Sequence, residues 1–571
     1  MVRVGQGHHI DDTDQLRDTG DASTWTNLNG LWEWEPTTAS GADTPPFQST
    51  LNGSILVPFP VESCLSGIPQ ATNAQSVVQH MFYRLVFDAV ANGSTTLLHF
   101  GAVDWQSKVY LNGKLLGNNT GGYNGFGFDV TPHLKTSHNE LIVYVFDPSD
   151  QGAQPNGKQR LSATDQPGGD TYTPSSGIWQ TVWLEEVPGT YISELTIDQA
   201  STQTVVVSAI AQGDDGNTST VQFEVVDPST NKVLVTGTSP VGQDVSLTLR
   251  DPVLWSPETP QLYNLRVTLG KDVVWGYFGL RTFQLGPGPK GQRPLLNGNF
   301  TFLAGFLDQS WWPDGLYTAP TDAALAYDIE AVPMFGLNMI RLHQKINPER
   351  WYYHADRLGI VVFQDMVQKY GGATSATVPL FVEDMKRAIM GRKNHPSIVQ
   401  FTTFNEGDCW KVFQDKPYDV AGIVALAHSL DPTRLIDTDS GGGANNLHIG
   451  DVNDIHSYPY PGDPTPSTSQ YAMVGEFGGI GAFVEGKEWK PNSCHTYLHV
   501  GTPQDEADAY VKMAHTIAGQ VDHVSASVYT QTTDVELECD GFLNFDRSPK
   551  FDEVDTARIK TANQAIIHAS R

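Results

Sequence analysis

The chain has 571 residues, 39% of them hydrophobic, and its 64 acidic against 35 basic side chains give a net charge of −29 at pH 7. This charge repels phosphate backbones and anionic membranes, so the sequence excludes nucleic acid and a membrane surface as expected partners. No stretch approaches the roughly 18 apolar residues that cross a membrane. Domains of about 100 to 250 residues suggest that the chain holds three of them.

Few features of the sequence bear on cellular location. The first ten residues contain no apolar core of a signal peptide, so we expect either a cytoplasmic protein or a secreted one whose leader is absent from this chain. Asn-x-Ser/Thr triplets favour secretion, although a chain this rich in Asn, Ser and Thr contains some by chance. The triplets begin at Asn52, Asn92, Asn118, Asn217 and Asn299.

Residues 1–188 contain short alternating segments separated by Gly, Pro and Asn turns, such as Leu97–Phe100 and Glu140–Phe146. The dipeptide Asn112-Gly113 is a strong hairpin signal. This pattern predicts antiparallel strands packed as a sandwich. Residues 189–286 continue as strands over about the length of an immunoglobulin-like sandwich, which we interpret as a spacer between the first and third domains.

After a Gly/Pro-rich linker at 285–291, apolar strands alternate with helices, which is the signature of a parallel α/β domain. One helix is expected to begin near Thr321, and the next to have Asn347 as its N-cap and Gly359 past its end. Eight strands and about 285 remaining residues predict a (β/α)8 barrel over 287–571. We expect its strands near 300–307, 337–343, 360–366, 398–406, 434–439, 454–460, 471–476 and 525–531.

Two of these strands end in a carboxylate. Glu406 follows the apolar run that begins at Ile398, and Glu476 closes a second run that begins at Tyr471. A (β/α) barrel keeps its chemistry at the C-terminal strand ends, and two carboxylates that face each other across a sugar can cleave a glycosidic bond. Either glutamate alone could equally be a solvated or helix-capping carboxylate. The surrounding motifs therefore decide whether the two form a catalytic pair.

The four cysteines show no Cys-x-x-Cys spacing, which argues against a zinc site and a thioredoxin-like motif. Three of them lie beside expected strand ends of the last domain, where either a disulfide or free buried thiols would fit. The cysteines are Cys64, Cys409, Cys494 and Cys539.

Short motifs follow one another in a specific order along nearly the whole chain. They are Leu28–Trp32, Ser176–Gln180, Leu254–Pro260, Phe278–Arg281, Gly336–Arg341, Asn405-Glu406, Gly475-Glu476 and Tyr529–Asp534. In this order the chain resembles glycoside hydrolase family 2, the family of β-galactosidases, β-glucuronidases and β-mannosidases. The resemblance implies a multidomain α and β fold, with a jelly-roll sugar-binding domain at 1–188, an immunoglobulin-like β-sandwich at 189–286 and a catalytic (β/α)8 TIM barrel at 287–571.

The resemblance also implies a retaining exo-β-glycosidase, in which Glu406 is the general acid/base, Glu476 is the nucleophile and Asn405 holds the sugar's 2-hydroxyl. Retention requires the two carboxyl groups to lie about 5 to 5.5 Å apart. Burial and the charge of Glu476 are expected to raise the pKa of Glu406. Arg341 could bond to Glu476 and keep it ionised, or instead form an ion pair with Asp365.

Further side chains at strand ends and in loops are candidates for substrate binding. His456 and Tyr458 could orient the nucleophile or touch the sugar, and His343 could reach a hydroxyl or remain a polar wall residue. Tyr529, in the last family motif, is counted among the substrate-binding residues. Indoles in loops over the site could stack on the sugar, with core packing as the alternative. These indoles belong to Trp311, Trp312, Trp410 and Trp489.

Two departures from the family pattern bear on the substrate. Gln364-Asp365-Met366 replaces the Asp-Glu pair of many β-galactosidases. The Asn-x-Lys element with which β-glucuronidases hold a carboxylate is not visible at 542–550, where Lys550 or Arg547 could serve instead. We expect β-galactosidase-like activity first, and leave β-glucuronidase, β-galactofuranosidase, β-mannosidase and arabinosidase activities open.

We expect a carbohydrate or glycoside as the partner, no cofactor and no metal, because no convincing set of metal ligands is visible. The oligomeric state is open, with a homodimer as one expectation. The alternative of another class is a carbohydrate-binding protein that has lost catalysis. The presence of both Glu406 and Glu476 argues against it, because binding alone needs no second buried carboxylate.

Overall fold

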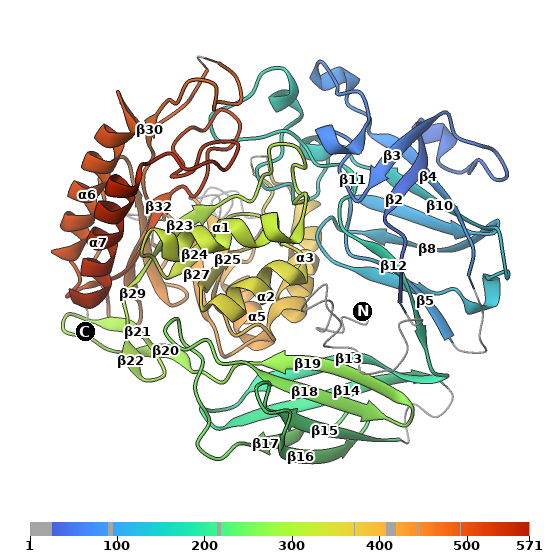
Figure 1. The fold of residues 1–571 in the computed structure, drawn as a ribbon, viewed down its shortest axis with the longest axis horizontal. Helices are drawn as coiled ribbons and strands as arrows, with labels where there is room; N and C mark the ends of the chain where they lie inside the picture. The colour runs from blue at the N-terminus through green and yellow to red at the C-terminus, as the bar shows by residue number, and fades with distance from the viewer. Residues whose placement is uncertain are drawn as a thin grey trace.

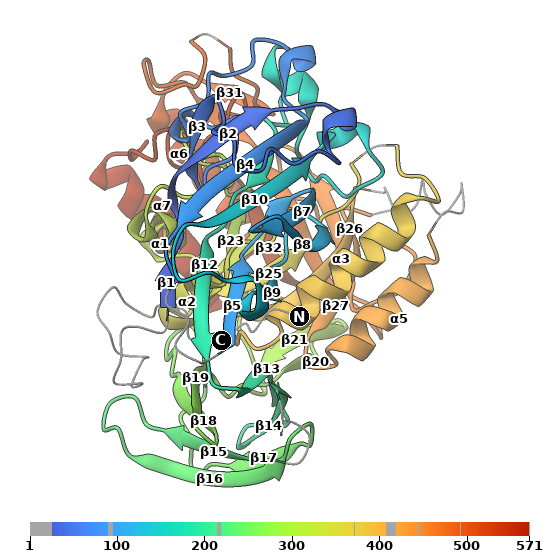
Figure 2. The same cartoon turned by 90° about the vertical axis from the view of Figure 1, so that its right-hand side faces the viewer.

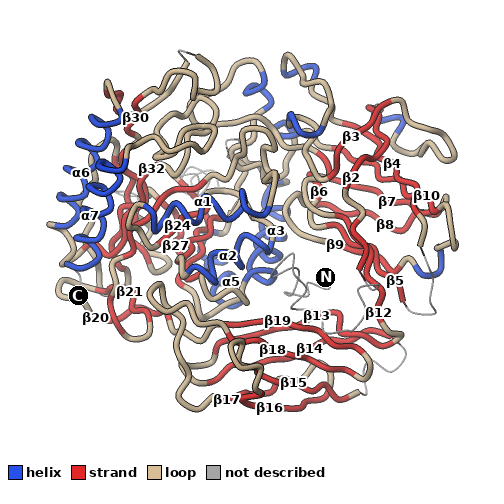
Figure 3. The backbone as a smooth tube through the Cα atoms, viewed as in Figure 1, coloured by secondary structure: helices blue, strands red, loops and turns tan. Residues whose placement is uncertain are grey.

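The computed structural model describes residues 25–89, 95–213, 219–370, 372–406, 418–442, 446–491 and 493–569. Two β-sandwiches flank a barrel, with the first sandwich at the right of Figure 1 and the second at the bottom. The long helices lie around the barrel (Figure 3). In the part of the chain that is described, no helix is long and apolar enough to cross a membrane.

The first sandwich consists of antiparallel strands, as the alternating segments predict. It comprises β1 (Trp25–Asn27), β2 (Gly30–Pro36), β3 (Gly53–Val57), β4 (His80–Phe87), β5 (Thr95–Phe100), β6 (Val103–Asp104), β7 (Gln106–Leu111), β8 (Lys114–Thr120), β9 (Phe126–Asp129), β10 (Asn139–Phe146), β11 (Gly177–Ile178) and β12 (Val182–Val187). One sheet has the order β3-β2-β4-β10-β7-β8 and the other β1-β12-β5-β9. Their inward apolar side chains, among them Trp32 and Phe100, form one core.

The second sandwich packs two antiparallel sheets, with orders β13-β14-β17 and β16-β15-β18-β19, around a separate core that includes Phe223 and Leu265. In Figure 2 this sandwich lies below the first sandwich and the barrel. Its strands are β13 (Thr190–Gln199), β14 (Thr204–Gly213), β15 (Thr220–Val226), β16 (Val233–Pro240), β17 (Val245–Thr248), β18 (Tyr263–Leu269) and β19 (Asp272–Phe278).

The stretch that was expected to be a linker is largely a β-hairpin. Strand β20 (Phe283–Pro287) pairs with β21 (Gln292–Leu296), which in turn pairs with β22 (Asn299–Phe300). The Gly/Pro-rich segment therefore supplies a strand end and the turn after it. Phe283 and Leu296 are buried against the apolar side chains of the barrel strands, so the hairpin closes one end of the barrel core.

Eight parallel strands form the barrel, in the order β27-β26-β25-β24-β23-β32-β29-β28, and the end strands β27 and β28 also contact each other. The predicted (β/α)8 barrel is confirmed, with a strand at each of the eight expected places. These strands are β23 (Leu303–Asp308), β24 (Met339–Leu342), β25 (Val361–Asp365), β26 (Ile398–Asn405), β27 (Leu435–Ser440), β28 (Val452–Ser457), β29 (Tyr471–Gly478) and β32 (Val524–Thr530), with the short pair β30 (Ile480–Ala482) and β31 (Leu498–Val500) outside the barrel.

Helix boundaries in the barrel follow local capping chemistry. The Thr321 side chain accepts a hydrogen bond at the start of α1, as expected, and Gly359 has the left-handed φ of 73° that ends α2. The predicted N-cap Asn347 is wrong by one residue, because its side chain donates to Ser310 Oγ and Pro348 takes the cap position. The helices are α1 (Asp322–Met334), α2 (Glu349–Leu358), α3 (Thr377–Arg392), α5 (Val420–Leu430), α6 (Pro503–Ala518) and α7 (Glu553–Ala569).

Candidate active site

The two predicted glutamates meet at the C-terminal end of the barrel. Glu406 directly follows β26, with a left-handed φ of 55°, and Glu476 lies in the last part of β29. The imidazole of His456, from β28, lies between them, with Nδ1 3.0 Å from Glu406 Oε1 and 3.3 Å from Glu476 Oε2. These three facing atoms all lie within 4.8 Å of one another, so the same side chains could also ligate a cation.

Arg341 connects the nucleophile candidate to its surroundings. Its guanidinium lies 3.0 Å from Glu476 Oε1 and 2.8 Å from Asp365 Oδ2, so the two alternative ion pairs occur together. Burial lowers the pKa of Arg341, but the Asp365 and Glu476 carboxylates outweigh burial and raise it. Burial likewise raises the pKa of Asp365, yet the Arg341 charge holds it below its ordinary value. Arg341 therefore stays charged and fixes the Glu476 carboxylate.

Asn405 points one unused donor into this site. Its Oδ1 accepts from Arg341 at 2.8 Å, and its backbone N–H donates to Gln368 Oε1 at 3.0 Å. Its buried Nδ2 has no hydrogen-bond partner among the described residues. A buried amide donor without a partner costs about 1–3 kcal/mol, which a sugar hydroxyl would offset.

The neighbours of His456 favour its protonated form. The Ser440 hydroxyl donates to Asp454 at 2.5 Å, so its oxygen is left to accept from His456 Nε2 at 2.9 Å. Nδ1 faces the two glutamates, which favours a proton on that nitrogen, whereas Nε2 also lies 3.3 Å from the Arg341 guanidinium. Burial lowers the pKa of His456, but the Glu476 charge and the hydrogen bond to Glu406 raise it above its ordinary value.

The expected rise in the pKa of Glu406 is wrong for this arrangement. Burial does raise it, but the hydrogen bond and the charge of His456, aided by Lys158 and His343, lower the pKa of Glu406 to about 2. The physical reason is the position of His456, whose Nδ1 lies 3.0 Å from Glu406 on the side that faces Glu476. A proton on this nitrogen is within hydrogen-bond distance of Glu406.

Tyr458 holds Glu476 from the other side. Its hydroxyl donates to Glu476 Oε2 at 2.6 Å, and its ring stacks on Tyr497 with centroids 3.7 Å apart and planes at 9°.

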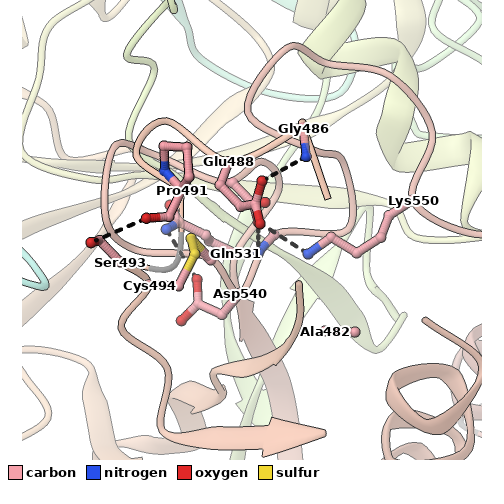
Figure 4. The surroundings of a disulfide bond; sticks show 12 residues. Ala482, Gly486, Glu488, Pro491, Ser493, Cys494, Gln531, Asp540 and Lys550 are labelled. Atoms are coloured by element: carbon pink, nitrogen blue, oxygen red, sulfur yellow. Dashed lines mark hydrogen bonds and ion pairs between the residues drawn. A yellow bond between two sulfur atoms is a disulfide. The ribbon is translucent and has the colours of Figure 1, made fainter. Parts of the chain in front are cut away.

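Tyr497 belongs to a loop that the Cys494–Cys539 disulfide ties to the segment after β32. Figure 4 shows Cys494 beside Gln531 and Asp540, which are themselves hydrogen-bonded at 3.1 Å. Of the alternatives for the cysteines, a disulfide is therefore present, Cys64 is free and exposed, and Cys409 lies outside the described residues.

Removing this disulfide is expected to affect both stability and activity. The double variant Cys494→Ser, Cys539→Ser should lose about 2–4 kcal/mol of stability, because the cross-link closes a 45-residue loop. It should also lower kcat/KM about tenfold, since the stacking partner of Tyr458 is no longer fixed. Thermal unfolding and initial rates measure the two effects, with Cys64→Ser as the control. Unchanged kcat/KM in the double variant would show that the loop does not position Tyr458.

The structure places two other predicted site residues, His343 and Tyr529, in buried positions. His343 lies at the end of β24, where Nδ1 is 2.6 Å from Asp365 Oδ2, so it supports the carboxylate that Arg341 binds. Tyr529 is fully buried, and its hydroxyl donates to the Ile480 and Asp540 carbonyls. The structure thus corrects the assignment of Tyr529 to the substrate site. Strand alternation turns the next residue, Thr530, inward to bond Tyr458 at 2.6 Å.

The tryptophans that were considered for stacking on the sugar differ in their surroundings. Trp410 lies outside the described residues. Trp489 is partly exposed, and the Lys490 ammonium lies over its indole, 4.3 Å from a ring centroid. Trp311 and Trp312 are buried at 1% and 3% exposure, which makes them packing residues.

The two basic residues that were expected to replace the carboxylate-binding element are already engaged. Lys550 Nζ lies 3.0 Å from Asp534 and 3.7 Å from Glu506, and its side chain is fully buried. Arg547 pairs with Asp328 at 3.3 Å and donates to a backbone carbonyl. Both side chains are therefore already bound to acidic residues of the protein.

Sequence reasoning missed the contribution of the first sandwich to this site. The ammonium of Lys158 lies over the ring of Tyr370, 4.9 Å from its centroid, and its charge lowers the pKa of Glu406. The loop that carries Lys158 shows neither strand nor helix periodicity, so no local pattern marks it. The only nearby signal is the family motif at Ser176–Gln180, where the same loop ends.

The fold and the two strand-end carboxylates define the class of a three-domain glycoside hydrolase with its site in a barrel. Family models cover most of the chain. Residues 48–188 match the sugar-binding domain, 188–281 the glycosyl hydrolases family 2 model, and 318–473 the TIM barrel domain of that family. The chain belongs to glycosyl hydrolases family 2, and the resemblance found in its motifs is confirmed.

Relatives and solved structures agree with this assignment. The chain is 27% identical over 372 residues to a putative β-glucuronidase of Formosa agariphila, covering 61% of this chain and 43% of the relative. It is 27% identical over 354 residues to the β-galactosidase BoGH2A of Bacteroides ovatus, covering 57% and 39%. The chain thus spans less than half the length of these relatives. A β-glucuronidase structure from Lactobacillus rhamnosus shares the fold, with a TM-score of 0.76, 18% identity and coverage of 97% and 98%.

Proposed function

We propose that this chain is a retaining exo-β-glycosidase that removes a terminal sugar from a glycoside. The observation that carries the proposal is the pair Glu406 and Glu476 at two strand ends, both in contact with one nitrogen of His456. One oxygen of each lies within 4.8 Å of the other, a short separation that supports direct attack on the sugar rather than attack by an intervening water. Membership of family 2 supports the same reaction.

In the proposed reaction, Glu476 attacks the anomeric carbon while the bond to the leaving oxygen breaks and that oxygen takes a proton from Glu406. Arg341 and Tyr458 hold Glu476 in place, and the unused amide donor of Asn405 binds a hydroxyl of the sugar. Water, deprotonated by Glu406, then cleaves the glycosyl ester and restores Glu476 with net retention.

His456 supplies the proton in this scheme. Its imidazolium is stabilised chiefly by the charge of Glu476. As Glu476 becomes an ester, its negative charge disappears and the pKa of His456 falls. His456 then holds its proton less tightly and can pass it to Glu406 more easily. The proton then passes from Nδ1 to Glu406 Oε1, 3.0 Å away, and on to the leaving oxygen. In the second step, the proton that Glu406 takes from water returns to Nδ1 of His456, which restores the starting state.

A binding protein without catalysis fits the site less well. Arg341 and Glu476 are 0% and 7% exposed, and burying such a group is costly even when it is paired. A protein that only binds sugar gains nothing from a second carboxylate, Glu476, that is paired with the buried Arg341. The arrangement is instead what a nucleophile requires, because it fixes an ionised carboxylate at one position.

A β-galactoside is the first candidate for the substrate, in line with several relatives that are named β-galactosidases. A β-glucuronide is the second candidate, favoured by the Lys158 ammonium, whose nearest carboxylate oxygen is 3.9 Å away in Asp170, and by relatives and structural neighbours named β-glucuronidases.

The test is the release of 4-nitrophenol from a panel of glycosides. The panel holds the β-galactopyranoside, β-glucuronide, β-galactofuranoside, β-mannoside and α-L-arabinofuranoside, with Glu476→Gln protein as the blank. We expect one sugar to be released far faster than the others, and only by the unaltered protein. Release at the level of the blank for every sugar, and also for natural oligosaccharides, would refute the proposed function.

A further inference from the structure

Lys158 reaches the active site from another domain. It lies in the loop between β10 and β11 of the first sandwich, yet its Nζ is 4.9 Å from the ring centroid of Tyr370, in the loop after β25 of the barrel. Its charge also acts on the carboxylates of Glu406 and Glu538. The ammonium therefore lies at the same end of the barrel as the proposed acid/base.

The backbone around Lys158 is fixed to the barrel. The N–H groups of Asn156 and Gly157 donate to the Gln368 carbonyl at 3.2 and 2.9 Å. Gly157 has a φ of 53°, and a Cβ there would lie 2.6 Å from the Gln344 carbonyl oxygen, so only glycine permits this approach. Gln368 also receives the backbone N–H of Asn405. One barrel residue thus holds both the Lys158 loop and a proposed sugar-binding residue.

The Lys158 ammonium has no hydrogen-bond acceptor among the described residues, although its side chain is only 7% exposed. Its nearest carboxylate oxygen, in Asp170, is 3.9 Å away and accepts instead from the Tyr370 hydroxyl at 3.1 Å. The Glu538 carboxylate accepts from Tyr172 and Gln309. A buried ammonium carries three donors and is normally paired.

The other cations around the site are committed. Arg341 is paired with Glu476 and Asp365, Lys550 with Asp534 and Glu506, and Arg547 with Asp328. Lys158 is therefore a buried cation whose ammonium donates no hydrogen bond to the described residues and whose charge acts on Glu406.

We propose that Lys158 is a specificity-determining residue that binds a carboxylate of the substrate. The proposal rests on the proposed glycosidase function and names a substrate class for it, the acidic glycosides. The carboxylate belongs either to the terminal sugar, as in a uronide, or to the leaving group. Both sources offer the same charge-assisted hydrogen bond to an ammonium that the protein leaves unfilled.

The experiment compares matched pairs of substrates in four proteins. The pairs are 4-nitrophenyl β-galacturonide with β-galactoside, 4-nitrophenyl β-glucuronide with β-glucoside, and 4-carboxyphenyl with phenyl β-galactoside. The proteins are the unaltered chain, Lys158→Met, Lys158→Arg and Lys369→Met. The last is a matched control, because Lys369 lies at the same interface but donates to the Asp150 carbonyl at 2.5 Å. Calorimetry with free galacturonate, glucuronate and their neutral sugars measures binding without turnover.

Lys158→Met should lower the acid-to-neutral ratio of kcat/KM about a hundredfold for one pair. Lys158→Arg should restore much of this ratio, and Lys369→Met should keep the ratio of the unaltered protein. Loss in the uronide pairs places the carboxylate on the sugar, and loss in the carboxyphenyl pair places it on the leaving group. Equal losses on acidic and neutral members, or no loss, would overturn the proposal and leave Lys158 as a ligand of hydroxyls or a packing residue.

Failure of this proposal is distinguishable from failure of the glycosidase function. Turnover of neutral glycosides without any preference for acidic ones, in rate or in binding, would remove the carboxylate site and keep the enzyme. Absence of all turnover, with calorimetric binding of a uronate that Lys158→Met abolishes, would keep the site and remove the enzyme. If calorimetry shows no Lys158-dependent gain from the carboxylate of the sugar, and the carboxyphenyl pair shows no Lys158-dependent preference in rate, the carboxylate site is ruled out.

Discussion

Glu476→Gln is expected to lower kcat by about four to six orders of magnitude, the scale on which an enzyme loses its nucleophile. The amide keeps the shape of the side chain but cannot form the glycosyl ester. The fold should survive, because Arg341 keeps its bonds to Asp365, Asn405 and the Gly475 carbonyl. Initial rates with a 2,4-dinitrophenyl glycoside of the preferred sugar measure the loss, and thermal unfolding checks that the protein is intact.

The stereochemistry of rescue separates the nucleophile from the acid/base. In Glu476→Gly, added azide can attack from the face that the carboxylate leaves empty, so the product should be the α-glycosyl azide, with inverted configuration. The matched control is Asp365→Asn, which weakens the other partner of Arg341 and should give no azide product. Formation of the β-glycosyl azide in Glu476→Gly would mean that the two glutamates have been assigned in the wrong order.

The sequence was sufficient for those features that depend on local pattern or on an ordered set of motifs. The barrel strands have four to eight residues, several of them, such as Val361–Asp365 and Ile398–Asn405, begin with apolar runs, and the C-terminal ends of parallel strands share one face. Glu406, Asn405, Arg341 and Glu476 were therefore expected to meet, and the hydrogen bonds of Arg341 join the last three.

Features that depend on distant contacts were beyond local reasoning. The pKa of Glu406 is set by His456, which lies on another strand and points its Nδ1 at both glutamates. Tyr529 and Thr530 are neighbours in a fully buried strand, so composition could not show which of them faces the site. Lys158 is brought to the barrel by backbone bonds from Gly157 to Gln368, a contact between residues far apart in the chain.

Glu406→Ala is expected to divide substrates by their leaving groups. A poor leaving group such as an alkoxide needs a proton as the bond breaks, so its release should slow by about two to four orders of magnitude. A 2,4-dinitrophenolate leaves without a proton, so formation of the glycosyl ester should remain fast. Hydrolysis of that ester then lacks its base, and the ester should accumulate.

Pre-steady-state absorbance should therefore show a burst of dinitrophenolate close to the enzyme concentration in Glu406→Ala, followed by a slow steady rate. Azide should raise the steady rate and give the β-glycosyl azide, because an anion needs no base and enters on the face where water normally attacks. The control Glu383→Ala removes an exposed glutamate that pairs with Arg387 on α3, outside the site, and should show no burst. Equal slowing of good and poor leaving groups would contradict the acid role, since a missing proton donor cannot slow a reaction that needs no proton.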